Sequence, residues 1–240
     1  MQMGIQMSKG NTGMKIIVIN GSPKGKASNT NVMVSSLLKG AREAGAKTEN
    51  VFLAEKEIEH CKGCHTCWQR GPGQCVINDD MLEVLSLMGG TNIICFASPV
   101  YFENISGMLK VFIDRMTMIG GPHSQVDGKE NAQHTEPLKA QSPKLMMISN
   151  CGHPNRSEFD VTSLWIRRLA KKMNMELIGE IYATQGKYLS DPPENLHSAV
   201  SGYLQLLEMA GKEIATDVKL SGDTEKLLQQ DFIYNVNQKV

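Results

Sequence analysis

The sequence predicts an α/β fold in three layers, α/β/α, in which helices cover both faces of a doubly wound, five-stranded parallel sheet. Two observations predict it. Apolar segments suited to buried strands alternate along the chain with segments whose apolar residues recur at helical spacing. The chain has 240 residues, which is long enough for one α/β domain with a full core and too short for two of ordinary size. In such a sheet, ligands bind outside the carboxyl ends of the strands.

The first strand and the loop after it are the most informative segment. Residues 16–19 are four consecutive branched apolar residues, which suits a strand buried on both faces. Ser28, Asn29 and Thr30 can each cap the helix that follows. A strand, a hydroxyl-rich loop and a helix N-terminus aim N–H groups, hydroxyls and the helix dipole at one point, which suits a phosphate. The alternative is an ordinary capped turn between a strand and a helix.

This loop differs from two common nucleotide-binding motifs. No Gly-Lys-Ser/Thr follows at the Walker A spacing, and the loop is not G-x-G-x-x-G. Hydroxyls and an amide, with few cations, suit a terminal phosphate monoester. We therefore expect the phosphate to be held by Ser22, Lys24, Ser28, Asn29 and Thr30.

The remaining elements are predicted from periodicity and cap residues. Further strands are expected at 48–53, 92–97, 144–149 and 176–182. Helices are expected from 28 to about 40 or 45, then at 79–89, 105–116, 161–172, 196–214 and 224–230. Residues 120–142 form a long polar stretch that is either a lid or a disordered insert. We expect residues 1–13 to be a flexible extension. Residues 14–240 would form one domain, with a cysteine loop at 61–75 and C-terminal helices within 196–230.

Three loops follow strands at the predicted carboxyl edge of the sheet. They are residues 21–30, 98–102 and 150–156. Because the carboxyl ends of parallel strands lie at one edge, we expect these loops to meet and form the ligand site.

Composition excludes several kinds of partner. The net charge is zero and the isoelectric point is near 7, so we expect neither nucleic acid nor an anionic membrane surface as a partner. No apolar run approaches the roughly 18 residues of a membrane span, and the N-terminus lacks the apolar core of a signal peptide. The chain has six cysteines, and crowding of four of them in a short segment does not suit a secreted disulfide framework. A cytoplasmic location is expected.

The second loop and the helix after it carry a family resemblance. Residues 98–115 read S-P-V-Y-F-E-N-I-S-G-M-L-K-V-F-I-D-R, and residues 21–30 fit G-S-P-x(5)-N-T. Both closely resemble motifs of the flavodoxin-like NAD(P)H-dependent FMN reductases, over about residues 15–185. The resemblance implies FMN, with its isoalloxazine ring along Pro99, Val100, Tyr101 and Phe102. Asn150, Cys151 and Gly152 would form a third flavin loop. Taken alone, the aromatic pair at 101 and 102 is more typical of core or rim packing.

Four cysteines form a second candidate site. Cys61, Cys64, Cys67 and Cys75 follow C-x2-C-x2-C-x7-C, with Gly63, Gly71 and Gly73 available for positive-φ turns. Such compact spacing suits a 4Fe-4S cluster. It also resembles the motif of the iron-sulfur flavoproteins of the same superfamily. A structural zinc site, a redox-active dithiol and an empty reduced loop remain alternatives.

Other polar residues are less informative. His60 and His65 flank the cysteines, and His123 and His134 lie in the long polar stretch. His153 and Arg156 follow residues 150–152, where they would meet a nicotinamide phosphate or an acidic substrate, or form only a solvated helix start. Asp114 and Arg115 are expected to be a structural pair, and Cys95 an inert core thiol.

The expected function is that of an FMN-dependent oxidoreductase. NADH or NADPH would reduce the flavin, which carries the chemistry, and a small acceptor such as a quinone would take the electrons. No side chain is assigned as catalytic. A 4Fe-4S cluster would add electron exchange with the flavin and make ferredoxin a partner. The resemblance also implies a homodimer or homotetramer. The contrasting interpretation is a non-enzymatic, flavodoxin-like electron carrier or redox sensor.

Overall fold

The structure is a computed structural model that describes residues 13–71, 73–120 and 142–233. The expected flexible extension lies almost entirely outside these residues. So do most of the polar stretch at 120–142 and its histidines, His123 and His134.

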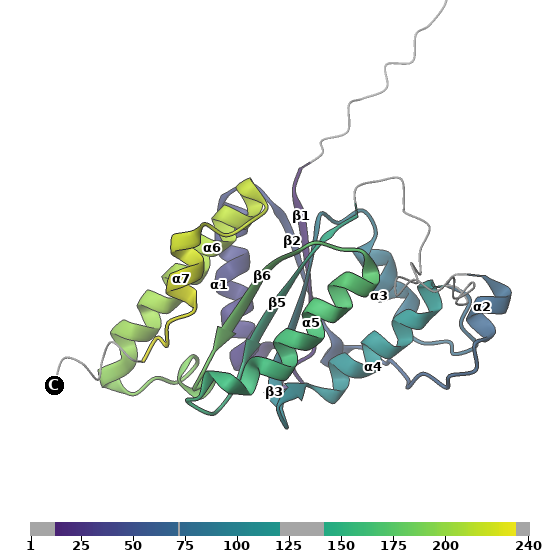
Figure 1. Cartoon of the computed structure of the whole chain (residues 1–240), viewed down its shortest axis with the longest axis horizontal. Helices are drawn as coiled ribbons and strands as arrows, with labels where there is room; N and C mark the ends of the chain where they lie inside the picture. Colours follow the sequence, from purple (N-terminus) through teal and green to yellow (C-terminus); the bar gives the residue numbers. More distant parts are fainter. Residues whose placement is uncertain (1–12, 72, 121–141, 234–240) are drawn as a thin grey trace, which may run out of the picture.

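A parallel sheet forms the centre of the molecule (Figure 1). Its strands lie in the order β2-β1-β3-β5-β6, which confirms the predicted doubly wound α/β fold with five parallel strands. The bounds are Lys15–Asn20 for β1, Lys47–Phe52 for β2, Ile93–Tyr101 for β3, Lys144–Asn150 for β5 and Leu177–Ala183 for β6. The central strands are buried on both faces, as their continuous apolar runs require.

One face of the sheet is covered by the first helix and by the last two. These are α1 (Asn29–Glu43), α6 (His197–Asp217) and α7 (Gly222–Leu228). Ile16 and Val18 of β1 point to this side and join a core with Leu37 of α1 and Leu207 of α6. Two glycines bring α1 and α6 into close contact, because a Cβ atom on Gly40 would lie 1.8 Å from Glu208 O and one on Gly211 would lie 1.9 Å from Leu37 O.

The opposite face is covered by α3 (Met81–Met88), α4 (Gly107–Arg115) and α5 (Asp160–Met173). Ile17 and Ile19 point to this side and pack in a second core with residues of all three helices. A short helix, α2 (Thr66–Arg70), lies in the cysteine loop. Single 3-10 turns occur at Gly25–Ala27, Leu53–Glu55, Met116–Ile119, Arg156–Phe159, Gly186–Tyr188 and Glu194–Leu196.

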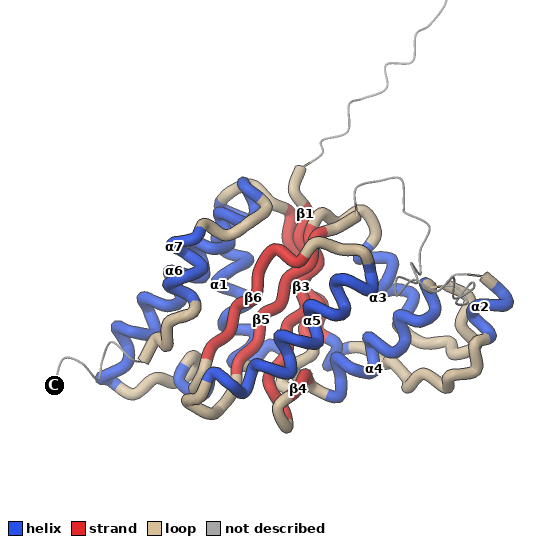
Figure 2. Tube along the Cα trace, in the orientation of Figure 1, coloured by secondary structure: helices blue, strands red, loops and turns tan. Residues whose placement is uncertain are grey.

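The prediction was wrong at the end of the third strand. Residues 98–102 were expected to be a loop, but β3 runs on to Tyr101 and turns back antiparallel as β4 (Asn104–Ile105), as Figure 2 shows at the lower edge of the sheet. Proline suggested a strand end because it cannot donate to a ladder. Pro99 is instead the last β3 residue to pair with β5, and the strand beyond it pairs with β4.

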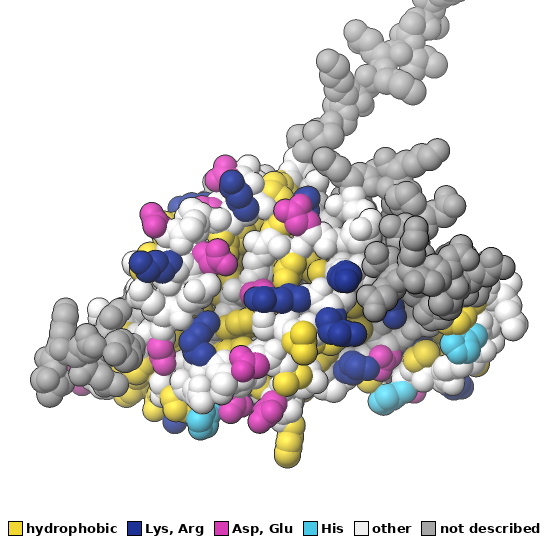
Figure 3. Space-filling view, in the orientation of Figure 1, with side chains coloured by type: hydrophobic (Ala, Val, Ile, Leu, Met, Phe, Trp, Pro, Cys, Tyr) yellow, Lys and Arg dark blue, Asp and Glu magenta, His cyan; other side chains and the backbone are white. Residues whose placement is uncertain are grey.

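The surface carries no dominant charge on the face seen in Figure 3, where basic and acidic side chains are interspersed. None of the helices in the described part of the chain combines the length and apolar character that crossing a membrane requires.

Candidate functional site

The three loops expected at the carboxyl edge of the sheet are joined by hydrogen bonds. Gly21 N donates to Ala97 O at 2.8 Å, and Ser106 Oγ donates to Gly21 O at 2.6 Å, which ties the first loop to the residues on either side of the second. Asn150 Nδ2 donates to Thr30 Oγ1 at 2.7 Å, which ties the first loop to the third. The predicted meeting of these loops is therefore confirmed.

Of Ser28, Asn29 and Thr30, which could each have capped α1, Ser28 is the N-cap. Its Oγ accepts from Asn31 N at 3.0 Å and donates to Gly25 O at 2.7 Å. The Ser28 hydroxyl is therefore engaged within the loop itself. Thr30 Oγ1 accepts from Asn150, so its own proton remains for another acceptor, and Asn29 Oδ1 accepts from Ser190 Oγ at 2.7 Å.

The first loop contains donors that suit an anion. The first N–H groups of α1, a helix of 15 residues, have no intrahelical acceptor and carry the positive end of its dipole. Ser22 is buried, and Lys24 is exposed beside it. Asn20 Oδ1 accepts from Ser22 N at 3.1 Å, while the buried Asn20 Nδ2 has no partner within residues 13–71, 73–120 and 142–233. Hydroxyl and amide donors of this kind fit a phosphate monoester.

The second loop is held by hydrogen bonds at its base, and the side chains at its tip are exposed. Ser106 N donates to Ser98 Oγ at 2.8 Å, and Ser106 Oγ accepts from Leu109 N at 3.1 Å as the N-cap of α4. Phe102 and Glu103 form the tip with φ angles of 48° and 60°. Phe102 is fully exposed and Tyr101 is 46% exposed, so this aromatic pair does not pack in the core.

The third loop is largely engaged by neighbouring backbone. Cys151 N donates to Ala183 O at 3.0 Å, and Gly186 N donates to Cys151 O at 2.7 Å. The Cys151 thiol donates to His153 O at 3.2 Å, and burial raises the pKa of this thiol, so it stays protonated. Gly152 is exposed. Arg156 Nη1 donates to Tyr182 O at 3.2 Å, so this side chain joins the third loop to strand β6.

The four cysteines of the cysteine loop line one pocket of about 20 Å³. Cys67 is buried, Cys75 is partly buried, and Cys61 and Cys64 are exposed. Among the residues described, no three His, Cys, Asp or Glu side chains converge in a metal-binding arrangement. The residues nonetheless fit a four-thiolate centre in kind, because all four cysteines line the same pocket and thiolates are the ligands of such a centre.

The backbone of the cysteine loop turns at the glycines that the sequence indicated. Gly63, Gly71 and Gly73 have φ angles of 62°, 114° and 82°. A hydrogen bond from Thr66 Oγ1 to Cys64 Sγ, 3.4 Å long, lowers the pKa of the Cys64 thiol. Burial raises the pKa of Cys67, and it also raises that of Cys95, which lies in the core as expected.

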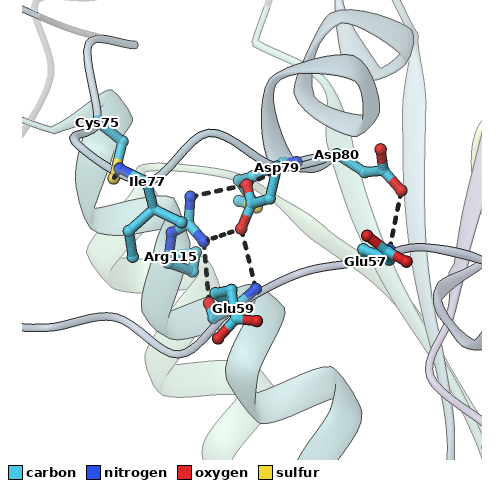
Figure 4. Close-up of polar contacts among 8 residues, drawn as sticks. Glu57, Glu59, Cys75, Ile77, Asp79, Asp80 and Arg115 are labelled. Carbon is cyan, nitrogen blue, oxygen red and sulfur yellow. Dashed lines mark hydrogen bonds and ion pairs between the residues drawn. The ribbon is translucent and has the colours of Figure 1, made fainter.

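An unexpected ion pair lies beside this pocket. Arg115 was expected to pair with Asp114, and this was wrong, because its guanidinium binds Asp79 through both terminal nitrogens (Figure 4). Asp114 instead pairs with Lys110 one helical turn away on the surface. Burial opposes the charge on both members, but their mutual hydrogen bonds leave the pKa of Asp79 lowered and that of Arg115 raised. The sequence did not indicate Asp79 as a site residue, because Asp79 lies 36 positions before Arg115 in the chain.

Comparisons with known proteins agree with this arrangement. The family model described as NADPH-dependent FMN reductase matches residues 14–133. An iron-sulfur flavoprotein of Archaeoglobus fulgidus is 39% identical over 107 residues, which are 45% of this chain and 47% of that protein. One of Methanocaldococcus jannaschii is 41% identical over 102 residues, which are 42% of this chain and 51% of that protein. The chain therefore spans about half the length of these relatives.

Solved structures match the fold over more of the chain. An NAD(P)H:quinone oxidoreductase from Methanothermobacter marburgensis superimposes with a TM-score of 0.61 at 14% identity, over 84% of this chain and 97% of that one. An FMN-dependent NADH-azoreductase from Bacillus anthracis, in complex with FMN, gives a TM-score of 0.57 at 15% identity, over 86% of this chain and all of that one. At such identities the likeness concerns the fold.

Proposed function

This chain belongs to the NADPH-dependent FMN reductase family, and from that premise we propose that it is an FMN-dependent oxidoreductase that oxidises NADH or NADPH. The observation that carries the proposal is the set of hydrogen bonds joining three loops at the carboxyl edge of the sheet. When bound, FMN supplies a ring that accepts hydride and passes on one or two electrons. The protein binds and orients it there.

The first loop would hold the FMN phosphate. Thr30 has a hydroxyl proton to give, and the α1 N-terminus adds backbone N–H groups and positive potential. Ser22, Lys24 and Asn29 would complete the donor set. Ser28 would act indirectly, because its hydroxyl shapes the loop.

The second and third loops would hold the isoalloxazine ring. Pro99, Val100, Tyr101 and Phe102 would line one edge, and Asn150, Cys151 and Gly152 another. Because the thiol of Cys151 is buried and protonated, it would provide a small packing surface rather than a nucleophile. Reduced nicotinamide and a small acceptor would then use the same open face in turn.

We further propose that Cys61, Cys64, Cys67 and Cys75 bind a 4Fe-4S cluster. Two facts support this: the four cysteine residues line one pocket, and the matched relatives carry the name iron-sulfur flavoprotein. The cluster would exchange electrons with a protein such as ferredoxin. A homodimer or homotetramer is part of the same proposal, with Leu204, Leu206 and the exposed Met209 of α6 as candidate contact residues. Leu207 of the same helix is fully buried in the core and is not available for such a contact.

The proposal is tested on full-length protein purified without oxygen. We expect flavin absorption, about four iron atoms and four sulfides per chain, and oxidation of NADPH or NADH when a quinone is added. Flavin without iron would remove the cluster from the proposal. Bound FMN without turnover of either nucleotide would contradict the reductase function and favour an electron carrier.

A further inference from the structure

Helix α4 connects the two candidate sites. It begins at the flavin loops, where its N-cap Ser106 bonds to Gly21 O and to Ser98 Oγ. It ends at Arg115, which lines the cysteine pocket. The Arg115 side chain is only 1% exposed, so its charge lies inside the protein. A buried charge is costly unless it is bonded, and the bonds of Arg115 therefore indicate its role.

Those bonds join both flanks of the cysteine loop. Before the cysteines, Glu59 O accepts from Arg115 Nη1 at 2.9 Å; after them, Asp79 accepts from both terminal nitrogens of the same guanidinium. The flanks also bond to each other, since Glu59 N donates to Asp79 Oδ2 at 2.9 Å and Glu57 N donates to Asp80 Oδ2 at 2.8 Å (Figure 4). The cysteine loop is thus closed at its base, and Arg115 fixes that base to α4.

One donor of Arg115 is left over. Its Nε is buried and makes no well-formed hydrogen bond in the part of the chain that the structure describes. Arg115 lines the same pocket as the four cysteines, and the Cys75 side chain is near enough to raise the pKa of the guanidinium both through its charge and as a hydrogen-bond acceptor. An unused N–H at the wall of a thiol-lined pocket has one evident class of acceptor, a thiolate sulfur.

We propose that Arg115 is a positioning residue of the cysteine centre, which holds both flanks of the cysteine loop and presents its Nε–H and positive charge to the metal-bound thiolates. This inference rests on the proposed metal centre but assigns a residue outside the four cysteines. Groups that orient ligands from behind commonly change metal affinity 10- to 100-fold when they are replaced.

The test is Arg115→Lys in the full-length, FMN-loaded protein. Lysine keeps the positive charge but lacks the planar fork and the Nε–H. The matched control is Arg167→Lys, because Arg167 also bonds a carboxylate, Glu180, at 2.7 Å, but on the far helix α5. Metal-free thiols are titrated with Co²⁺, whose thiolate charge-transfer absorption reports sulfur coordination. FMN affinity is measured on the same samples.

We expect Arg115→Lys to weaken Co²⁺ binding at least tenfold, with unchanged FMN affinity. The iron-loaded variant should also have a lower reduction potential, because a hydrogen bond to sulfur is lost. Arg167→Lys should match the unaltered protein in all three measurements. Equal Co²⁺ binding by the two variants would overturn the inference, as would the absence of a cobalt–thiolate band in the unaltered protein. Either result leaves FMN binding and NADPH oxidation as separate tests of the proposed function.

If Arg115→Lys fails to retain FMN, Asp79→Asn provides the same comparison, since it removes the charge that holds the guanidinium. Weakened Co²⁺ binding with retained FMN would again support the inference, and unchanged Co²⁺ binding would overturn it.

Discussion

Asp79 is the side chain on which the base of the cysteine loop depends. Its carboxylate accepts bonds from Arg115, from Glu59 N and from Met81 N. Burial works against its charge, but these bonds hold the pKa below the usual value. Because the folded-state pKa is lower than the unfolded value of about 3.9, the pair stabilises the fold above that pH. The contribution is lost as the pH falls through the folded-state pKa.

Replacing Asp79 should therefore cost stability in a pH-dependent way. We expect Asp79→Asn to lower the free energy of unfolding by about 3 kcal/mol at pH 7, because it leaves the buried Arg115 charge uncompensated. The difference from the unaltered protein should shrink as the pH falls from the unfolded value of about 3.9 through the lower folded-state pKa of Asp79. Urea unfolding across this pH range measures both. Asp114→Asn is the control, since its pair with Lys110 is exposed and should contribute little.

Thr30 is the residue that most directly tests the phosphate site. Thr30→Val keeps the shape but removes the hydroxyl that accepts from Asn150. We expect FMN affinity to fall roughly tenfold or more, the loss typical of a hydrogen bond to a charged group. Quenching of flavin fluorescence measures this. Thr216→Val, at an exposed position of α6, should leave the affinity unchanged. An unaffected Thr30→Val variant would place the phosphate elsewhere.

At this scale, the sequence predicts local relations well and distant ones poorly. Ser28 could be proposed as a cap because its partner, Asn31, is three residues away. Asp79 could not be assigned to Arg115, because nothing in the sequence shows that a loop residue comes to the end of α4. A neighbouring acidic residue was chosen instead. Similarly, Phe102 could be identified as aromatic, but its full exposure follows from the hairpin turn.

Among the elements, α1 and α6 form a close helix pair. Gly40 and Gly211 allow backbone to approach backbone, with no space for a side chain between them. Gly202, in the same helix α6, has no atom within 4 Å of where its Cβ would lie. Replacing Gly202 changes only helix propensity, whereas replacing Gly211 also disturbs packing, so comparing the two separates these effects.

We expect Gly211→Ala to destabilise the protein by about 3 kcal/mol, because the methyl group would force α6 away from Leu37 O. Gly202→Ala should instead stabilise it by up to about 1 kcal/mol, the gain in helix propensity. Thermal or urea unfolding gives both values. Equal effects of the two substitutions would contradict the close contact.

Periodic elements were predicted best. The longer helices and the apolar strands have strong patterns, and their bounds agree with the structure to within a few residues. Short elements were missed. Helix α2 has 5 residues and β4 has 2, too few for a period to be visible. The turn at Phe102 and Glu103 also lacks the glycine or asparagine that would mark it, although both residues have positive φ.

Across the whole molecule, the sheet gathers three loops at one edge, and this much of the site could be predicted from strand order alone. The hydrogen bonds between particular residues of the site could be identified only from the structure.

If the site binds the phosphate, FMN should stabilise the protein as a whole. At 100 times its dissociation constant, FMN should add about 2.7 kcal/mol, or roughly 5 to 10 °C in Tm. Riboflavin, which lacks the phosphate, should give a much smaller shift at the same concentration. Equal shifts would argue against the loop of residues 21–30 as a phosphate site.

Because α1 packs against α6, part of its surface stays uncovered during synthesis until α6 has been made. Lys39 of α1 and Glu208 of α6 form an ion pair across 169 positions of the chain. A ribosome adds roughly 5 to 20 residues per second, so the apolar side of α1 stays uncovered for on the order of 10 to 30 s before α6 emerges. During that interval the apolar side of α1 is exposed to solvent and to other chains. A chaperone that binds exposed apolar segments would therefore have access to α1 throughout this interval.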